Sequence, residues 1–179
     1  YRTADPVTGE HLSAGTEGEL ISRGPSHMLG FWAKPDETVL ALRDDWVYSG
    51  DLGRVDGDGY LHLTGRTKEL YKSGGELVMP VEIEALVDAH PAVSQAYGVG
   101  VPDDTWGEIG WLYVTAEAEA DQQAVIAEIE TLRRDNLAKF KVPKRVIFAD
   151  AATLPIAPTG KVQKFRLVER ALAEMNDVT

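Results

Sequence analysis

The chain has 179 residues, of which 44% are hydrophobic and 26% charged, a composition typical of a folded globular protein and too apolar for a disordered one. Its 18 basic and 29 acidic residues give a net charge of −11, which argues against a general nucleic-acid binder. Cysteine is absent, which excludes disulfides and cysteine nucleophiles, and no apolar run approaches the roughly 20 residues of a membrane-spanning helix.

The charge is unevenly distributed along the chain. Residues 133–170 contain ten Lys and Arg against three Asp and Glu, a local charge of +7, so the remainder sums to −18 (−11 − 7). A basic segment in an acidic chain suggests a bound phosphate or nucleotide-like cofactor, and a solvated basic face explains it equally well. The chain starts at Tyr1 without Met or a leader, which we interpret as the middle of a larger protein.

Residues 1–66 are rich in Gly, Pro and short alternating runs, which predicts β structure. The segment 56–59 (Asp-Gly-Asp-Gly) separates two strand-like runs and predicts a hairpin turn, because Gly supplies positive φ. Its carboxylates suggest calcium, but an EF-hand requires further ligands where Tyr60 and Thr67 stand. The four His residues are scattered, so we predict no metal site.

After Arg66 the pattern alternates helix and strand, which indicates an α/β or α+β unit with its own core. Pro80 stands where a first helical residue is favoured. The expected elements are a helix from Pro80, strands at 93–101 and 109–115, a helix at 122–138, a strand at 145–148, and a last helix with an apolar stripe of Phe165, Val168, Leu172 and Met175.

Three segments combine glycine, charge and a loop-forming context. Asp51 follows Gly50, where a carboxylate either accepts hydrogen bonds from a ribose diol or forms an Asx turn. Segment 65–76 holds three cations and then a Gly pair, without the Lys-Ser/Thr of a P-loop. In segment 154–164, two prolines stiffen a loop that presents Lys161, a point charge suited to phosphate.

In this order and spacing, the three segments resemble the adenylate-forming superfamily of acyl-CoA synthetases, luciferases and peptide-synthetase adenylation domains. Residues 8–38 also look like the β-rich subdomain of that family, and 101–108 and 139–143 look like its C-terminal domain. The resemblance implies an α+β or α/β fold in two parts. Residues 1–67 are expected to be the β-rich end of the large N-terminal domain, and 68–179 a small mobile C-terminal domain with a short sheet flanked by helices.

The resemblance also implies roles for single residues in the first of two half-reactions, the formation of an acyl-adenylate. Asp51 and Arg66 are expected to bind the ribose and phosphates of ATP or AMP. Lys68 is expected at the hinge about which the C-terminal domain rotates. Lys161 matches the catalytic lysine that bridges the α-phosphate and the substrate carboxylate, where a cation stabilises the charge that gathers.

For the second half-reaction, thioester formation, Gly74 and Gly75 match a loop that lines the pantetheine tunnel of CoA, with Lys72 as a nearby basic contact. The basic segment 133–170 fits the CoA phosphates. The segments around Gly74 and Lys161 look more like acyl-CoA synthetases than peptide-synthetase domains, which usually carry Asp at the hinge.

The expected function is therefore that of the C-terminal part of a cytoplasmic, AMP-forming acid–thiol ligase that uses a small carboxylic acid, ATP and CoA. Mg²⁺ and most of the ATP site are expected in a preceding part, because the family's phosphate loop and adenine-binding segment have no counterpart in the chain. For the same reason we expect the chain alone to be inactive. The alternatives are a non-catalytic binding or regulatory module and a part of a peptide-synthetase adenylation domain.

Overall fold

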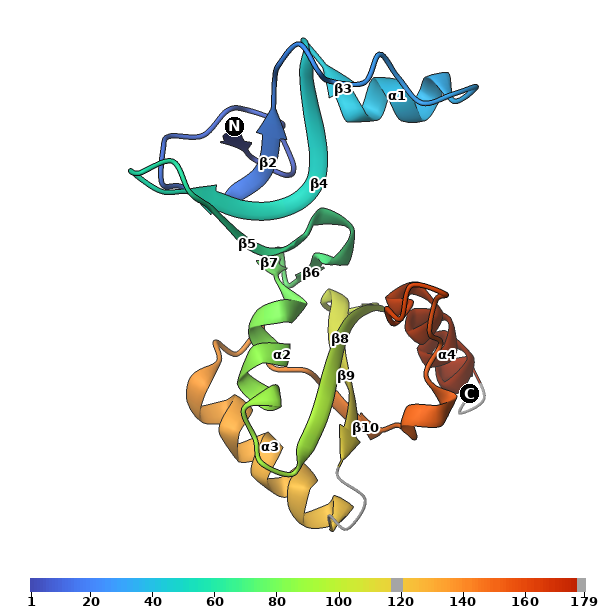
Figure 1. Cartoon of the computed structure of the whole chain (residues 1–179). Helices are drawn as coiled ribbons and strands as arrows, with labels where there is room; N and C mark the ends of the chain where they lie inside the picture. Colours follow the sequence, from blue (N-terminus) through green and yellow to red (C-terminus); the bar gives the residue numbers. More distant parts are fainter. Residues whose placement is uncertain (117–120, 177–179) are drawn as a thin grey trace. The chain divides into compact units, whose positions relative to one another are not determined.

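The computed structural model describes residues 1–116 and 121–176. The chain divides into two compact units, Tyr1–Lys68 and Glu69–Thr179, and the boundary falls within the 3-10 helix η1 (Thr67–Glu69). Figure 1 follows the elements in chain order, with the first unit in blue to teal and the second in green to red. Each unit has its own sheet, so each is described separately.

The first unit is an antiparallel five-stranded sheet with one short helix. The strand order is β1-β2-β4-β3, and β5 pairs with β4. Its elements are β1 (Arg2–Ala4), β2 (Gly18–Ser22), α1 (Pro35–Ala41), β3 (Leu42–Arg43), β4 (Trp46–Val55) and β5 (Leu61–Arg66). The buried apolar side chains are few, Ala4, Leu20, Ile21 and Leu52, and they belong to β1, β2 and β4.

The predicted hairpin turn between β4 and β5 is confirmed. The Asp56 carboxylate accepts hydrogen bonds from the backbone N–H of Asp58 at 3.0 Å and of Tyr60 at 2.9 Å, and contacts His62 Nε2 at 2.7 Å. The hydrogen bond from His62 and those from the turn lower the pKa of Asp56. The carboxylate thus serves the turn, as an Asx-type residue does.

Helix α1 was not predicted. Its signals were nevertheless present in the sequence, because Pro35 occupies the first turn and Asp36 and Glu37 follow it. The helix has no buried residue, so it lacks the apolar periodicity by which the other helices were found.

The second unit is a mixed sheet between helices. The strand order is β10-β9-β6-β7, β8 pairs with β9, and β10 is parallel to β9 while the other pairs are antiparallel. Its elements are β6 (Tyr71–Ser73), β7 (Glu76–Val78), α2 (Pro80–Asp88), β8 (Val93–Asp103), β9 (Gly107–Ala116), α3 (Gln122–Asn136), β10 (Arg145–Phe148), the 3-10 helix η2 (Ala151–Thr153) and α4 (Lys164–Asn176).

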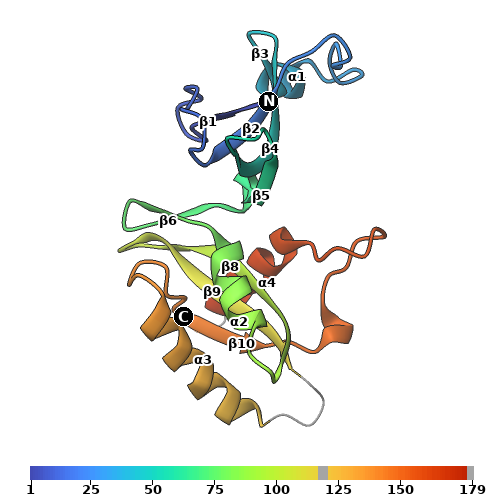
Figure 2. The ribbon, with the colours of Figure 1, turned by 60° about the vertical axis from the view of Figure 1, so that its left-hand side comes forward.

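Strand β9 is buried on both faces and divides the core of the second unit in two. Leu112 and Val114 pack with residues of α2 and α3, whereas the alternate residues Trp111 and Tyr113 pack with α4. Figures 1 and 2 show α2 and α3 on one side of β8 and β9 and α4 on the other. This three-layer arrangement confirms the α+β fold expected for a small domain with a short sheet flanked by helices.

The predicted buried stripe of the last helix is partly wrong. Phe165 is 58% exposed and Leu172 is 37% exposed, whereas Leu167 and Ala171 are fully buried. The other two predicted positions lie partly buried at the edge of the same cluster. The apolar spacing of both stripes fits a helix, and the docking of α4 on β9 selects between them. On α3, Arg133 is buried and the neighbouring Leu132 only partly so.

Candidate functional site

The predicted nucleotide-binding residues of the first unit lie opposite each other at the end of the β4–β5 ladder. Asp51 is the register partner of Arg66, and Arg66 Nε lies 3.1 Å from Asp51 Oδ1. The backbone before Asp51 is held in place, because Gly50, with a φ of 76°, donates its N–H to Glu19 Oε1 at 2.9 Å. The structure therefore brings these two predicted residues together, with the Arg66 side chain 61% exposed.

Lys68, the predicted hinge residue, is exposed and is the last residue of the first unit. The residue before it, Thr67, donates its hydroxyl to the Gly50 carbonyl at 3.2 Å, and the residue after it, Glu69, opens the second unit. The anchored chain of the first unit thus ends one residue before Lys68.

Gly74 and Gly75 form the tip of a hairpin between β6 and β7. Their φ values are 62° and 88°, and Ser73 pairs with Glu76 on either side, which is the two-residue turn that favours glycine at both positions. The sequence contains a signal for this turn, since a Gly pair between two β-type runs predicts a hairpin. Lys72 lies on β6, two residues before the tip.

The hairpin tip is fastened to the turn between β8 and β9. Lys72 donates its backbone N–H to Glu108 Oε2 at 2.8 Å, and Gly74 donates to the Trp106 carbonyl at 2.9 Å. A Cβ on Gly74 would lie 2.8 Å from the Trp106 ring, whereas one on Gly75 would meet nothing within 4 Å. Lys144 Nζ lies 5.1 Å from the centre of the same ring. Gly74 therefore packs inward, and Gly75 leaves its outer side open.

Lys161 lies on a closed loop that leads into α4. The backbone N–H of Ala157 donates to the Lys161 carbonyl at 2.8 Å, and that of Gln163 donates to the Pro155 carbonyl at 2.8 Å. Gly160, with a φ of 81°, makes the turn between these two contacts. The Lys161 side chain is exposed. The loop thus holds the backbone of Lys161 while its ammonium group faces solvent.

A partly buried ion-pair cluster begins directly after this loop, and sequence reasoning missed it. Lys164, the first residue of α4, lies with its Nζ 2.8 Å from Glu84 Oε1 and also hydrogen-bonds Glu69. Burial raises the pKa of Glu84. Burial works to lower the pKa of Lys164, but the charges of the two glutamates and their hydrogen bonds outweigh it and raise that pKa. The three residues are far apart in sequence, so no local pattern signals the cluster.

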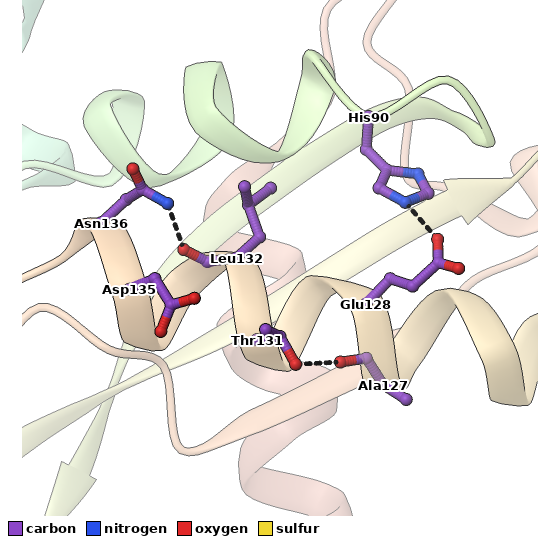
Figure 3. A pocket seen from close by; sticks show the side chains of 7 residues that line it. All are labelled: His90, Ala127, Glu128, Thr131, Leu132, Asp135 and Asn136. Carbon is purple, nitrogen blue, oxygen red and sulfur yellow. Dashed lines mark hydrogen bonds and ion pairs between the residues drawn. The ribbon is translucent and has the colours of Figure 1, made fainter.

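A groove of about 490 Å³ lies elsewhere, along α3 (Figure 3). His90, just past the end of α2, contacts Glu128 at 2.7 Å between Nε2 and Oε2. Polar groups farther along α3 satisfy its own backbone, as Asn136 Nδ2 donates to the Leu132 carbonyl at 2.8 Å. None of the predicted site residues lines this groove.

Neither a metal-binding group nor a membrane-spanning helix is found in residues 1–116 and 121–176. Over those ranges, no group of three or more His, Asp or Glu side chains is arranged to hold a metal ion. None of the helices found there combines the length and apolar character needed to cross a bilayer.

A protein-family model and several known proteins match this chain. Residues 82–161 match the family model described as AMP-binding enzyme C-terminal domain. The chain is 40% identical to a feruloyl-CoA synthase of an Amycolatopsis species over 165 residues. The match covers 91% of the chain and 32% of that protein. The chain is also 37% identical over 162 residues to a fatty acid–[acyl-carrier-protein] ligase of Streptomyces coeruleorubidus, covering 90% of the chain and 30% of that ligase.

A solved structure gives the same result for the fold. The ATP-bound structure of MatB from Rhodopseudomonas palustris matches with a TM-score of 0.83 and 40% identity, over 94% of this chain and 33% of that one. The chain spans about a third of the length of the relatives it matches. These matches confirm the predicted resemblance to the adenylate-forming superfamily. Within that superfamily, they relate the chain to the C-terminal portion of CoA ligases and acyl-CoA synthetases.

Proposed function

We propose that this chain is the C-terminal part of an ATP-dependent acyl-CoA synthetase. In the first half-reaction, a carboxylate oxygen of the substrate attacks the α-phosphorus of ATP, which forms an acyl-adenylate and releases pyrophosphate. In the second, the CoA thiol attacks the acyl carbon and loses its proton, which forms the thioester and releases AMP. The family match and the CoA ligases among the relatives support the general ligase class.

One observation carries the proposal. The second unit presents two sets of predicted residues on separate elements, Lys161 on the loop before α4 and the open Gly75 at the β6–β7 tip. In the first half-reaction, the cation would stabilise the negative charge that gathers at the reacting oxygens. In the second, the open glycine would leave room for the narrow pantetheine arm that carries the thiol. The second unit thus carries one predicted contribution to each half-reaction.

In the first half-reaction, the Lys161 ammonium would neutralise charge where the carboxylate meets the α-phosphate. Asp51 would accept hydrogen bonds from the ribose hydroxyls, and Arg66 would both orient Asp51 and reach the ribose or phosphates. The 3.1 Å contact between Asp51 and Arg66 supports this, because it organises the carboxylate before the nucleotide binds. We assign Mg²⁺, which accompanies ATP in phosphoryl chemistry, to residues outside this chain.

In the second half-reaction, the tip at Gly74 and Gly75 would line the path of pantetheine. Lys72 lies beside it, and Lys144 stands over the Trp106 ring that supports Gly74. Lys72 and Lys144 are suited to the CoA phosphates as point charges.

Rotation of the second unit at Lys68 would replace Lys161 by the Gly75 tip at the reacting atoms between the two half-reactions. In this chain, a single exposed residue between the anchored Thr67 and Glu69 is a suitable pivot.

The test is an assay of the full-length synthetase that contains this chain, with aromatic and fatty acids as substrates. Pyrophosphate release that requires both acid and ATP, followed by thioester formation with CoA, is the expected result. The 179-residue chain is the control and should release none, because it spans about a third of its relatives. Absence of pyrophosphate release with every acid would contradict the proposal and favour a non-catalytic binding module.

A second candidate exists for the thiol acceptor, which we have so far taken to be CoA. The fatty acid–[acyl-carrier-protein] ligase among the relatives favours a carrier-protein thiol as the second candidate. Both acceptors end in phosphopantetheine, so the Gly75 tip suits either. Parallel assays with CoA and with a phosphopantetheinylated carrier protein separate them, because the CoA nucleotide contacts proposed for Lys72 and Lys144 serve only CoA.

A further inference from the structure

The partly buried cluster of Glu69, Glu84 and Lys164 joins three parts of the second unit that are distant in sequence. The Lys164 side chain is 19% exposed, that of Glu84 is 13% exposed and that of Glu69 is 34% exposed. Removing a lysine and two carboxylates from much of their water is costly, and close pairing of the charges offsets that cost. Here the ammonium has both carboxylates within hydrogen-bond distance.

Each member of the cluster is attached to a different element. Glu84 lies on α2, and its Oε1 also accepts the backbone N–H of Gly98 in β8 at 2.6 Å. Glu69 is the first residue of the second unit, directly after Lys68. Lys164 begins α4 and follows Gln163, whose N–H closes the Lys161 loop on Pro155.

The connections from Lys164 are short. Along the chain, two residues, Val162 and Gln163, separate it from Lys161, and backbone hydrogen bonds close the loop just before it. Across the fold, one ion pair links it to the residue after the hinge, and another links it to α2 and β8. A displacement at Glu69 is therefore transmitted to the base of the Lys161 loop without passing through a flexible segment.

We propose that Lys164 is a positioning residue for the adenylation half-reaction, because it ties the Lys161 loop to the residue that follows the hinge. The inference rests on the proposed function and adds to it a role for three residues outside the predicted site. Rotation at Lys68 then moves Glu69 and the Lys161 loop as one body, and Lys161 arrives at the reacting oxygens in a set position. No cluster side chain lies within 4 Å of the position that a Cβ on Gly75 would take.

The kinetic test compares Lys164→Met with Lys164→Arg in the full-length synthetase. Lys164→Met removes the charge at similar length and should slow adenylate formation at least about tenfold, mainly in kcat, since a misplaced catalytic group loses rate rather than binding. Thioester formation from supplied acyl-adenylate should change less than about twofold. Lys164→Arg should restore most of the adenylation rate, because it can still pair with both glutamates.

Two further variants separate positioning from loss of charge or of stability. Arg166→Met removes a cation from the same helix, where the residue is exposed, and should leave adenylate formation unchanged. Glu69→Gln should lower adenylation like Lys164→Met, and the double variant should be no worse than either alone. Equal losses in both half-reactions, additive losses, or unchanged adenylation with Lys164→Met would each overturn the inference.

Hydrogen exchange of the 179-residue chain tests the same link without catalysis. Lys164→Met should accelerate exchange of the Gln163 and Gly98 amides at least about tenfold and leave the central amides of β9 unchanged. Unchanged exchange at Gln163 and Gly98 would overturn the positioning role even if the synthetase is active. Accelerated exchange in a protein that makes no adenylate would instead retain the link and contradict only the proposed function.

Discussion

Asp51 and Arg66 are register partners across β4 and β5, and their side chains meet at 3.1 Å between Oδ1 and Nε. The pair is largely exposed, and exposed ion pairs contribute only about 0–1 kcal/mol to stability. It therefore does little for the fold. Under the proposed function, the ion pair instead orients the Asp51 carboxylate before the nucleotide binds.

Replacement of Asp51 by Ala should raise the KM for ATP about tenfold or more, since hydrogen bonds to a charged group contribute about 1.5–3 kcal/mol. The melting temperature should change little, for the reason given above. Steady-state kinetics of the full-length synthetase and a thermal melt provide the two measurements. Asp58→Ala, which removes an exposed carboxylate from the β4–β5 turn, is the control. An unchanged KM for ATP would remove Asp51 from the nucleotide site.

Replacement of Lys161 by Ala should lower adenylate formation by about 10² or more, the scale of one lost transition-state donor. Thioester formation from a supplied acyl-adenylate and CoA should change little. The fold should be unaffected, because the loop is closed by backbone hydrogen bonds and the side chain is exposed. Single-turnover assays of each half-reaction measure both rates. Equal slowing of both would replace the phosphate role with a structural one.

Substitution at the hairpin tip should act in the opposite direction. Gly75→Leu should obstruct the thiol and slow thioester formation while sparing adenylation, because the outer side of Gly75 is open. Gly74→Ala is the contrasting variant, since its Cβ would lie 2.8 Å from the Trp106 ring and should loosen the tip by displacing that ring. Both glycines have positive φ, so each substitution also carries some backbone strain. A Gly75→Leu variant with normal thioester formation would contradict the tunnel assignment.

The hinge can be tested by proteolysis and by proline. We expect limited proteolysis to cut first near 67–69 and to release a stable fragment that begins there, because Lys68 is exposed and lies at the boundary between the two units. Lys68→Pro should slow overall turnover of the full-length synthetase, because proline fixes φ. Lys68→Ala, which leaves φ free, is the control. First cleavage within α3, or a Lys68→Pro variant with normal turnover, would count against a hinge at this position.

Stability at alkaline pH should depend on Tyr113. Burial, followed by the charge of Glu174, raises the pKa of Tyr113 to about 12 from 10.0, and its hydroxyl donates to the Leu167 carbonyl at 3.0 Å. Because the folded pKa is the higher one, this contribution is complete below pH 10.0 and is lost as pH rises toward 12.

Tyr113→Phe should therefore cost about 1 kcal/mol at neutral pH, the usual net contribution of one hydrogen bond, and should flatten the loss of stability above pH 10. Urea unfolding followed by circular dichroism at several pH values gives both quantities. Tyr60→Phe, at a residue that is 70% exposed, is the control and should change neither. If the stability of Tyr113→Phe fell as steeply above pH 10 as that of the wild type, the alkaline loss could not be assigned to Tyr113.

The elements with strong local signals could be predicted from the sequence. The β4–β5 hairpin follows from its Asp-Gly turn, and α2, α3, β8, β9 and β10 follow from apolar periodicity and their bounding residues. Family resemblance also singled out Lys161 and the pair Asp51 and Arg66, because each lies in a short segment with recognisable spacing. Such features depend on residues close together in the chain, so a linear pattern contains them.

Other features were decided only by tertiary structure. The face that α4 buries could not be predicted, since both apolar stripes have helical spacing and the docking on β9 selects Leu167 and Ala171. The cluster of Glu69, Glu84 and Lys164 spans 95 residues of sequence. In the sequence its carboxylates look like ordinary surface charges, and only the fold brings them, partly buried, against one lysine. Desolvation and long-range pairing depend on where the chain returns in space, and no local sequence pattern specifies that.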